Sequence, residues 1–431
     1  MPLNYRRGGV TYQINLYDSD TNWENSLKLR QSGATKYAQL STNMYHRELT
    51  HMRVREGGDT YGVLKQRDDL ELFAWGYNER GNLGLGDQTS RSSPTQVGAE
   101  SEWVNMTTSW EGQFHLNYPI FGGGIKSDGS LWMWGSNSEG MLGQEDRVAR
   151  SSPVQVGLDT DWRLIRTGDG CTYAIKNDNS LWWWGDNAVG QRGNGTVGNN
   201  QSSPNQVGSL TDWLDIIGGG YGSMLALKTD GTLWAWGYNS MGECGFGDTT
   251  SRSSPVQIGT STNWTAIGSG YRFSGAVNSN GELFTWGQNT NGSLGQGNIT
   301  NISSPVQVGS LTNWRTISCG FRNMVSLKTD GTLWTWGYNH AGQLGQEDLI
   351  SRSSPIQVGS DTDWETAKSG NYTVVTIKTD GTIWSWGTNY NGELGQNDRV
   401  LRSSPTQIGS DTDWRNVRTQ RSGFTLVRKE A

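Results

Sequence analysis

The side chains that most often carry out chemistry in proteins are few in this chain and lie far apart. No CxxC pair, HExxH helix, phosphate-binding glycine loop or GxSxG elbow occurs in the sequence, so a disulfide framework, a metal centre and the common catalytic motifs are not expected. No carboxylate pair or nucleophile beside a base stands out either. The sequence therefore predicts a protein that is not an enzyme and that binds no cofactor and no metal. The scattered cysteines and histidines are Cys171, Cys244, Cys319, His46, His51, His115 and His340.

Two other groups of residues could bind a ligand. The acidic pairs Asp361/Asp363 and Asp411/Asp413 have the chemistry of calcium ligands, but no further ligand spacing follows them. We therefore expect these pairs to bend the chain before a strand. The 22 tryptophans could stack on a sugar or a nucleotide, and their spacing decides whether they do.

The tryptophans belong to an internal repeat. Trp-Gly occurs seven times at intervals of 50 to 59 residues, and each copy is followed by Ser-Ser-Pro and then by a second tryptophan. Because fourteen tryptophans recur so strictly, we expect them to pack between repeats rather than to bind a ligand. The first set is Trp75, Trp134, Trp184, Trp236, Trp286, Trp336 and Trp386, and the second is Trp103, Trp162, Trp213, Trp264, Trp314, Trp364 and Trp414.

Each repeat has the character of four short strands. Segments rich in β-branched and aromatic residues flank an Asp-Gly pair such as Asp230-Gly231, which is a strong signal for a β-hairpin. Seven antiparallel sheets of this kind bury their faces best in a closed ring. The sequence predicts an all-β fold, a seven-bladed β-propeller of four-stranded antiparallel blades over residues 67–431. We expect segment 424–429 to close the ring by pairing with segment 70–75.

The repeat W-G-x-N-x-x-G-x-L-G-x-G-D, followed by S-S-P-x-Q-V-G and x-A-L-K-T-D-G, resembles the regulator of chromosome condensation repeat. The resemblance covers about residues 67–431 and implies a seven-bladed propeller. It implies no single function, because the family includes exchange factors, a plant UV-B photoreceptor, a β-lactamase inhibitor and interaction modules.

In the photoreceptor branch of this family the turn after the second tryptophan looks like Gly-Trp-Arg-His-Thr. Tyr271 and Phe321 replace that tryptophan here and the histidine is absent, which counts against UV-B sensing.

Residues 1–66 lie outside the repeat and contain three glycine turns followed by tyrosine. We expect a small β-rich module, which either attaches the protein to an assembly or packs on the ring as an extension. It has nine Lys/Arg and six Asp/Glu, whereas the remainder has 26 and 35. The segment is similar to N-terminal segments of bacteriophage virion proteins. No apolar stretch suggests a secretory signal or a membrane span.

Function is expected where the repeats differ. The first interval is 59 residues long, and its extra residues fall within 106–124; this insertion is either a contact loop or a plug. The turn after each second tryptophan also varies, and its aromatic and arginine side chains either bind a partner or pack against the next blade. The predicted partner-binding residues are Trp110, Phe114, Tyr118 and Phe121 in the insertion, and Tyr221, Tyr271, Arg272, Phe321, Arg322 and Tyr372 in the turns.

The leading hypothesis is a non-enzymatic structural or interaction protein of a phage virion, such as a tail, fibre or capsid decoration protein. In this view the 1–66 module docks on other virion or assembly proteins, and the propeller loops bind a protein or glycan surface. The alternative is an intracellular, cytoplasmic interaction scaffold or a guanine-nucleotide-exchange-type regulator. A propeller that inhibits an enzyme by plugging its cleft is a third possibility. Nucleic acid is not an expected partner because the net charge is −6, and a homo-oligomer remains open.

Overall fold

The computed structural model of the chain describes residues 3–7, 10–15, 26–31, 34–42, 49–56, 59–65, 70–109, 119–419 and 423–430. Contacts divide the chain into two compact units, Met1–Asp68 and Asp69–Ala431. Almost all regular structure in the described residues is β-strand, and one 3-10 turn, η1, spans Gly220–Gly222. Among these residues we find no helix of the length and apolar character that a membrane crossing requires.

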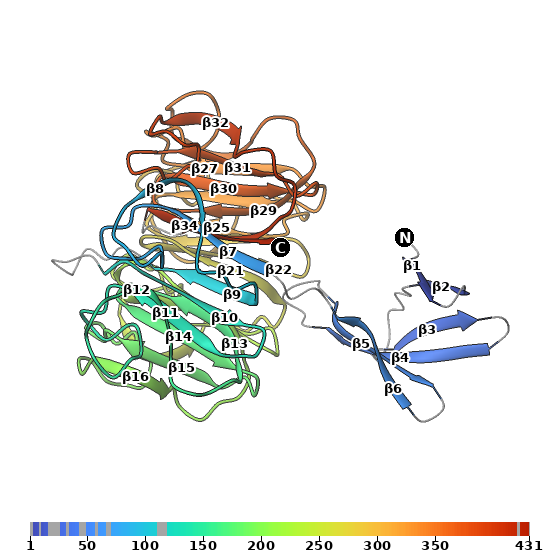
Figure 1. The fold of residues 1–431 in the computed structure, drawn as a ribbon. Coiled ribbons are helices and arrows are strands. Elements are labelled where there is room, and N and C mark those ends of the chain that lie inside the picture. The colour runs from blue at the N-terminus through green and yellow to red at the C-terminus, as the bar shows by residue number, and fades with distance from the viewer. Residues whose placement is uncertain are drawn as a thin grey trace. The chain divides into compact units, whose positions relative to one another are not determined.

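The N-terminal unit is one antiparallel sheet in which each strand pairs with the next along the chain. This meander, drawn in blue in Figure 1, confirms that the region is β-rich. Its attachment role stays a prediction. The strands are β1 (Leu3–Arg7), β2 (Val10–Asn15), β3 (Ser26–Gln31), β4 (Ala34–Thr42), β5 (Leu49–Glu56) and β6 (Asp59–Lys65).

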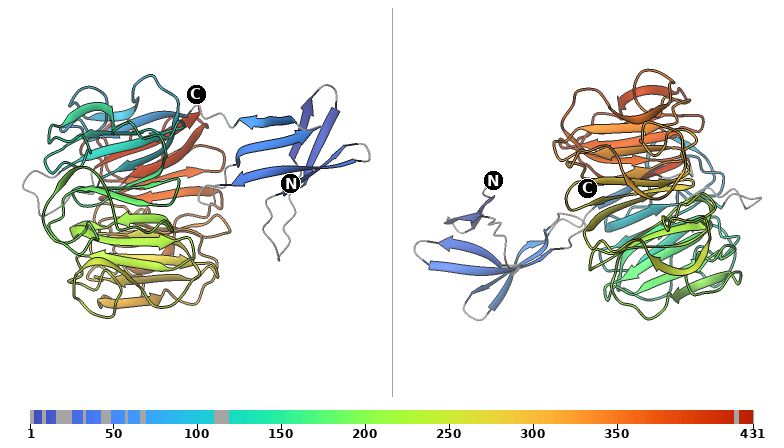
Figure 2. Two further views of the ribbon diagram at one scale, coloured as in Figure 1. Left: turned by 90° about the horizontal axis from the view of Figure 1, so that it is seen from below. Right: turned by 180° about the vertical axis from the view of Figure 1, so that it is seen from behind.

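The second unit consists of seven four-stranded antiparallel sheets, which confirms the predicted seven-bladed propeller (Figures 1 and 2). Blades 1 to 3 are β9 (Trp103–Thr108), β10 (Phe121–Lys126), β11 (Leu131–Gly135) and β12 (Arg150–Gln155); β13 (Trp162–Thr167), β14 (Cys171–Lys176), β15 (Leu181–Gly185) and β16 (Gln201–Gln206); and β17 (Trp213–Gly218), β18 (Ser223–Lys228), β19 (Leu233–Gly237) and β20 (Arg252–Gln257). Blades 4 to 6 are β21 (Trp264–Ser269), β22 (Phe273–Asn278), β23 (Leu283–Gly287) and β24 (Ile302–Gln307); β25 (Ser318–Cys319), β26 (Asn323–Leu327), β27 (Leu333–Gly337) and β28 (Arg352–Gln357); and β29 (Trp364–Ser369), β30 (Thr373–Lys378), β31 (Ile383–Gly387) and β32 (Arg402–Gln407). Blade 7 contains β33 (Trp414–Thr419), β34 (Phe424–Glu430), β7 (Leu70–Gly76) and β8 (Arg91–Gln96).

The two chain ends of this unit meet in blade 7. Strand β34 pairs antiparallel with β7, in a register that sets Phe424 opposite Gly76 and Glu430 opposite Leu70. Figure 1 shows the red C-terminal strand beside the blue strand β7. Blade 7 is therefore built from both ends of the ring, which leaves no open edge between its first and last blades.

The Asp-Gly hairpins form as their sequence predicts. In blade 3 the Asp230 carboxylate accepts hydrogen bonds from the backbone N–H of Thr232 at 2.9 Å and from its hydroxyl at 2.6 Å. Gly231 has φ +76°, and a Cβ atom there would lie 2.2 Å from the carbonyl oxygen of Thr262. Only glycine fits this turn without displacing the next segment of the chain.

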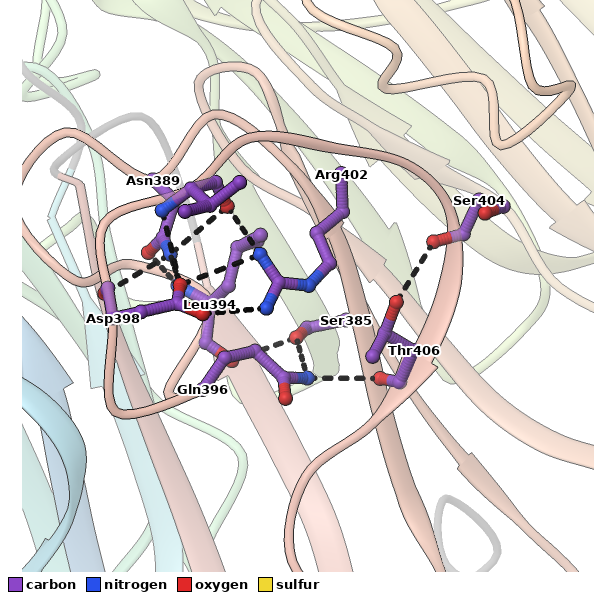
Figure 3. Close-up of polar contacts among 9 residues, drawn as sticks. Ser385, Asn389, Leu394, Gln396, Asp398, Arg402, Ser404 and Thr406 are labelled. Carbon is purple, nitrogen blue, oxygen red and sulfur yellow. Dashed lines mark hydrogen bonds and ion pairs between the residues drawn. The ribbon is translucent and has the colours of Figure 1, made fainter.

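The recurrent asparagine after Trp-Gly organises the loop between the third and fourth strands. In blade 6 the Asn389 amide donates to the backbone oxygens of Asp398 and Val400, and its carbonyl oxygen accepts from the Leu394 N–H at 3.0 Å. Arg402 then pairs with Asp398 at 2.6 Å. Figure 3 shows this network at one corner of the blade. The asparagine is therefore a scaffold residue, since it supplies the loop with backbone partners.

The two tryptophan sets fill the spaces between blades. Each Trp-Gly indole is fully buried and donates its N–H to a backbone carbonyl of the preceding blade, as Trp336 does to Ser293 at 2.9 Å. The second set is buried too, and it packs edge to face on other rings, as Trp364 does on Trp384 with centroids 6.0 Å apart. These tryptophans therefore build the ring, as their recurrence predicts.

The first strand of each blade is the innermost one. Strands β9, β13, β17, β21, β25, β29 and β33 each contact the first strand of the next blade, and β33 contacts β9 to complete the circle. Side chains that leave these strands toward the ring axis therefore meet side chains from other blades.

Candidate interaction surface

The two variable places in the sequence occupy equivalent positions in the fold. The insertion connects β9 to β10 in blade 1, and the variable turns connect the first and second strands of later blades. Trp110, Phe114 and Tyr118 lie outside the described residues. Phe121 opens β10 and is fully buried in the hydrophobic core, so it supports the blade and offers no surface to a partner.

Four of the predicted turn residues come together as one aromatic arc, which we define as Tyr221, Tyr271, Phe321 and Tyr372. The ring of Tyr271 lies 5.0 Å from Tyr221 and 4.5 Å from Phe321, centroid to centroid, and Phe321 lies 5.4 Å from Tyr372. All three pairs meet edge to face, which is a favourable geometry for aromatic rings. The arc therefore links blades 3 to 6 across their interfaces.

Backbone hydrogen bonds fix the turns that bear the arc. The Gly220 N–H donates to the Gly270 carbonyl at 2.9 Å, and the Phe321 N–H donates to the Gly370 carbonyl at 3.2 Å. Tyr221 has φ +62°, a left-handed conformation that is costly for a residue with a side chain. Its ring is held by stacking on Tyr238 at 5.6 Å. The surface is therefore preformed, because each turn is bonded to its neighbour.

The arc has a buried middle and half-buried ends. Tyr271 and Phe321 are only 6% and 5% exposed, so these two rings mainly pack against neighbouring blades. Tyr221 and Tyr372 are half-buried. The prediction that these residues pack against the next blade thus describes Tyr271 and Phe321 in the middle of the arc. Tyr221 and Tyr372 at its ends retain exposed surface that a partner could contact.

Two arginines lie on the arc. The Arg272 guanidinium is centred 3.8 Å from the ring centroid of Tyr221, and that of Arg322 is 4.9 Å from Phe321. Both side chains are half-buried, and no carboxylate in the described part of the chain pairs with either. The buried Nε atoms of both have no hydrogen-bond partner there. The arc therefore presents two planar cations on aromatic rings.

Three further residues join this surface without having been predicted. Tyr238 and Tyr338 directly follow Trp-Gly, and His340 lies two residues further on. Tyr338 stacks on His340 at 5.2 Å and lies 6.1 Å from Tyr372. A signal was present, because the residue after Trp-Gly varies between repeats. Its place beside the turn follows from the register of the second and third strands of the blade, which sets Ser223 opposite Gly237 and Asn323 opposite Gly337.

Glu243 is the titratable group buried beneath this surface. It is 1% exposed, and its carboxylate accepts a hydrogen bond from the Met241 N–H at 2.7 Å. Burial raises the pKa of Glu243 to about 7, against the lowering effect of that N–H and of the Arg272 charge. The carboxylate is therefore about half ionised at pH 7, and only its ionised form puts a negative charge near Arg272.

The acidic pairs before the second tryptophans hold lysines. Lys378 Nζ lies 2.7 Å from Asp361 Oδ2 and 3.1 Å from Asp363 Oδ1. The same ammonium is 4.7 Å from the ring centroid of Trp364. The expected bend before the strand is thus only part of their role, because the pairs also clamp a lysine that covers the tryptophans.

Comparison with known proteins agrees with this architecture. Residues 123–368 match the model of the RCC1-like domain, and residues 71–111 and 380–418 match the regulator of chromosome condensation (RCC1) repeat. The solved structure of human WBSCR16 superposes with a TM-score of 0.74 at 17% identity, covering 84% of this chain and 99% of that one. Saccharomyces cerevisiae Prp20p superposes with a TM-score of 0.70 at 18% identity, covering 84% and 92%.

Curated relatives match over shorter stretches. The ultraviolet-B receptor UVR8 of Arabidopsis thaliana is 28% identical over 191 residues, which are 44% of this chain and 42% of the receptor. The mitochondrial RCC1 domain-containing protein RUG3 of the same plant is 27% identical over 220 residues, 47% of each chain. The chain thus spans less than half the length of these two relatives.

The fold and the repeats define the class: this is a seven-bladed propeller built from tandem repeats. Because the domain model matches more than half of the chain, the protein belongs to the RCC1-like domain family. The curated relatives reported above are an ultraviolet-B receptor and a mitochondrial protein, and neither of them supports a bacteriophage virion protein. They favour the alternative hypothesis of an interaction scaffold or regulator.

Proposed function

We propose that this protein is an interaction scaffold that binds a protein partner through the aromatic arc and its arginines. The observation that carries the proposal is the placement of Arg272 and Arg322 on aromatic rings with no carboxylate pairing them in the described residues. Arginine and aromatic residues are the types most enriched at the energetic centres of protein interfaces. A guanidinium held on a ring also loses little freedom on binding.

The chemistry of the surface indicates the kind of partner. Two guanidinium groups favour carboxylates, and the half-buried rings of Tyr221 and Tyr372 favour an apolar or aromatic side chain beside them. A protein surface with acidic residues around an exposed apolar side chain fits both requirements. Relatives of the same fold support binding of proteins in general: Prp20p of Saccharomyces cerevisiae binds Gsp1p and histones, and a further structure has Kap60 bound to the same yeast protein. We place this role inside the cell, since one relative, RUG3, is a mitochondrial protein.

The test uses the full chain as bait in an extract of the source organism, with quantitative mass spectrometry of the captured proteins. A variant with Arg272→Ala and Arg322→Ala should lose its main partner by at least tenfold. The matched control is Arg147→Ala with Arg399→Ala, since both of these arginines are exposed on blade loops. Equal capture by both variants would reject this surface as the binding site. Recovery of capsid or tail proteins as the main partners would instead restore the virion hypothesis.

A further inference from the structure

A group of like charges gathers at the centre of the ring, apart from the aromatic arc. Arg166, Lys368 and Arg418 each lie four residues after the second tryptophan of their repeat, on the innermost strands β13, β29 and β33. The other repeats have uncharged residues at this position: Thr107, Ile217, Gly268 and Ser318. Three of the seven blades therefore bring a cation to the same level of the inner wall.

One carboxylate lies among these cations. Asp215, on the innermost strand β17, approaches the Nε of Arg166 with its Oδ1 at 3.3 Å. Both side chains are shielded, at 12% and 17% exposed. The Asp215 carboxylate also accepts the Ile216 N–H at 2.8 Å. This acid is thus already engaged by Arg166, and it cannot neutralise three cations.

Lys368 and Arg418 have no acidic partner in the described residues. Arg418 Nη1 donates only to uncharged oxygens, Asn416 Oδ1 at 3.4 Å and the Val417 carbonyl at 3.3 Å. No hydrogen bond or ion pair with described residues engages the Lys368 ammonium. Both side chains are half-buried. Charged groups that are partly withdrawn from water are normally paired, so this arrangement lacks an anion.

The charges act on one another across the ring. Burial, with the neighbouring charges of Arg418 and Arg166, lowers the pKa of Lys368 to about 7. Burial and the charge of Arg166 likewise lower the pKa of Arg418 to about 9. Blades 2, 6 and 7 thus contribute charges near the ring axis, in agreement with their common repeat position on the innermost strands.

We propose that the ring centre of this propeller binds a small divalent oxyanion of the phosphate type, held by Arg166, Lys368 and Arg418. When Lys368 is protonated, the three cations and the one carboxylate among the described residues leave an excess of two positive charges, which a dianion would neutralise. The guanidinium groups suit the oxygen geometry of phosphate and sulfate. The site is independent of the proposed partner surface, so either can fail without the other.

Binding should depend on pH through Lys368. Among the described residues, the charged or titratable groups that act on it are Arg166 on β13, Asp215 on β17, Cys319 on β25 and Arg418 on β33, and the charge of Arg428 on β34 acts on Arg418. Burial raises the pKa of the Cys319 thiol, so this group stays neutral. Lys368 is charged at pH 6 and mostly neutral at pH 8, so affinity for an anion should fall about tenfold between them.

The experiment is isothermal titration calorimetry of the full chain with sodium sulfate, whose charge does not change between pH 6 and pH 8. Sodium chloride of equal ionic strength serves as the blank. We expect saturable binding at one site per chain, about tenfold weaker at pH 8. Lys368→Gln should reduce the affinity at pH 6 at least tenfold and remove the pH dependence, whereas Arg399→Gln on an exposed loop should change neither.

Parallel titrations separate the possible sources of the anion. If the protein binds inorganic phosphate but not glycerol 3-phosphate, the ligand is a free ion. If it binds both, the site also accepts a phosphate ester. Each result supports the site. A melting temperature that rises in Lys368→Gln without any anion would support it as well, because the substitution removes an unpaired charge. Absence of saturable binding by all three anions at pH 6, or unchanged binding in folded Lys368→Gln, would overturn the proposal.

Discussion

The hydroxyl of Tyr271 in blade 4 donates a hydrogen bond of 2.7 Å to the hydroxyl of Tyr221 in blade 3. This bond and the contact of Tyr271 with Phe321 join three consecutive blades through side chains alone. The middle of the aromatic arc is therefore part of the cohesion of the ring. Substitutions that remove these buried rings would therefore weaken both partner binding and the packing between blades, and a binding assay alone could not separate the two effects.

The first prediction separates these effects. Phe321→Ala should lower the free energy of unfolding by about 3 to 5 kcal/mol, because it opens a cavity between blades. Tyr271→Phe keeps the ring and should cost about 1 kcal/mol. Arg322→Ala should cost about 1 kcal/mol or less, since the half-buried guanidinium makes cation–π contacts but no ion pair with the described residues. Urea unfolding of the three variants checks this order, and a larger loss for Arg322→Ala than for Phe321→Ala would contradict it.

A second prediction concerns the buried acid beneath Arg272. The folded protein raises the pKa of Glu243 from 4.5 to about 7, so between these values the folded state binds more protons than the unfolded state. The free energy of unfolding should therefore fall as pH rises from 4.5 to 7. Glu243→Gln should remove this fall and stabilise the protein at pH 8 by roughly 1 to 3 kcal/mol.

The substitution is conservative because other repeats have glutamine at this place. Gln343 Oε1 accepts the Ala341 N–H at 2.9 Å, just as Glu243 accepts the Met241 N–H. Glu393→Gln is the matched control, since Asn391 donates to Glu393 from both its backbone and its side chain. We expect a smaller gain there. Chemical denaturation at pH 5 and pH 8 measures both variants, and equal gains at the two pH values would count against a titrating Glu243.

The features that could be predicted from the sequence are those whose residues recur in every repeat. The propeller, the Asp-Gly turns and the packing of the two tryptophan sets all follow from positions that recur, such as Trp336 and Gly231. The ring-centre cations were missed because Arg166, Lys368 and Arg418 are far apart in the sequence and meet only when the ring closes. Periodicity predicts what one blade shares with the next, but it does not show which side chains from distant blades face each other.

A third prediction addresses ring closure. Deleting residues 424–430 removes the strand between β33 and β7, and with it the burial of Phe424 and Leu426. We expect the whole propeller to lose its cooperative thermal transition or to melt at least 15 °C lower, because blades 1 and 6 lose their common neighbour. Circular dichroism and calorimetry check this. A variant without residues 1–15, which are outside the ring, provides the comparison and should melt within about 2 °C of the full chain.

The last prediction installs a missing lysine clamp. Burial lowers the pKa of Lys328, and Asp330 opposes this only in part. The pKa of Lys378 is raised, because the hydrogen bonds that its ammonium donates to Asp361 and Asp363 outweigh burial. Blade 5 has Leu311 and Asn313 where blade 6 has the two acids.

Replacing both residues, Leu311→Asp and Asn313→Asp, should raise the pKa of Lys328 above its ordinary value and stabilise the protein by about 0.5 to 1 kcal/mol at low salt. The gain should shrink in 1 M sodium chloride, since added salt screens half-exposed ion pairs. NMR titration of the Lys328 side chain measures the pKa, and urea unfolding at both salt concentrations measures the stability. Leu311→Asn with Asn313 unchanged is the uncharged control, and an equal gain from it would show that the clamp is not electrostatic.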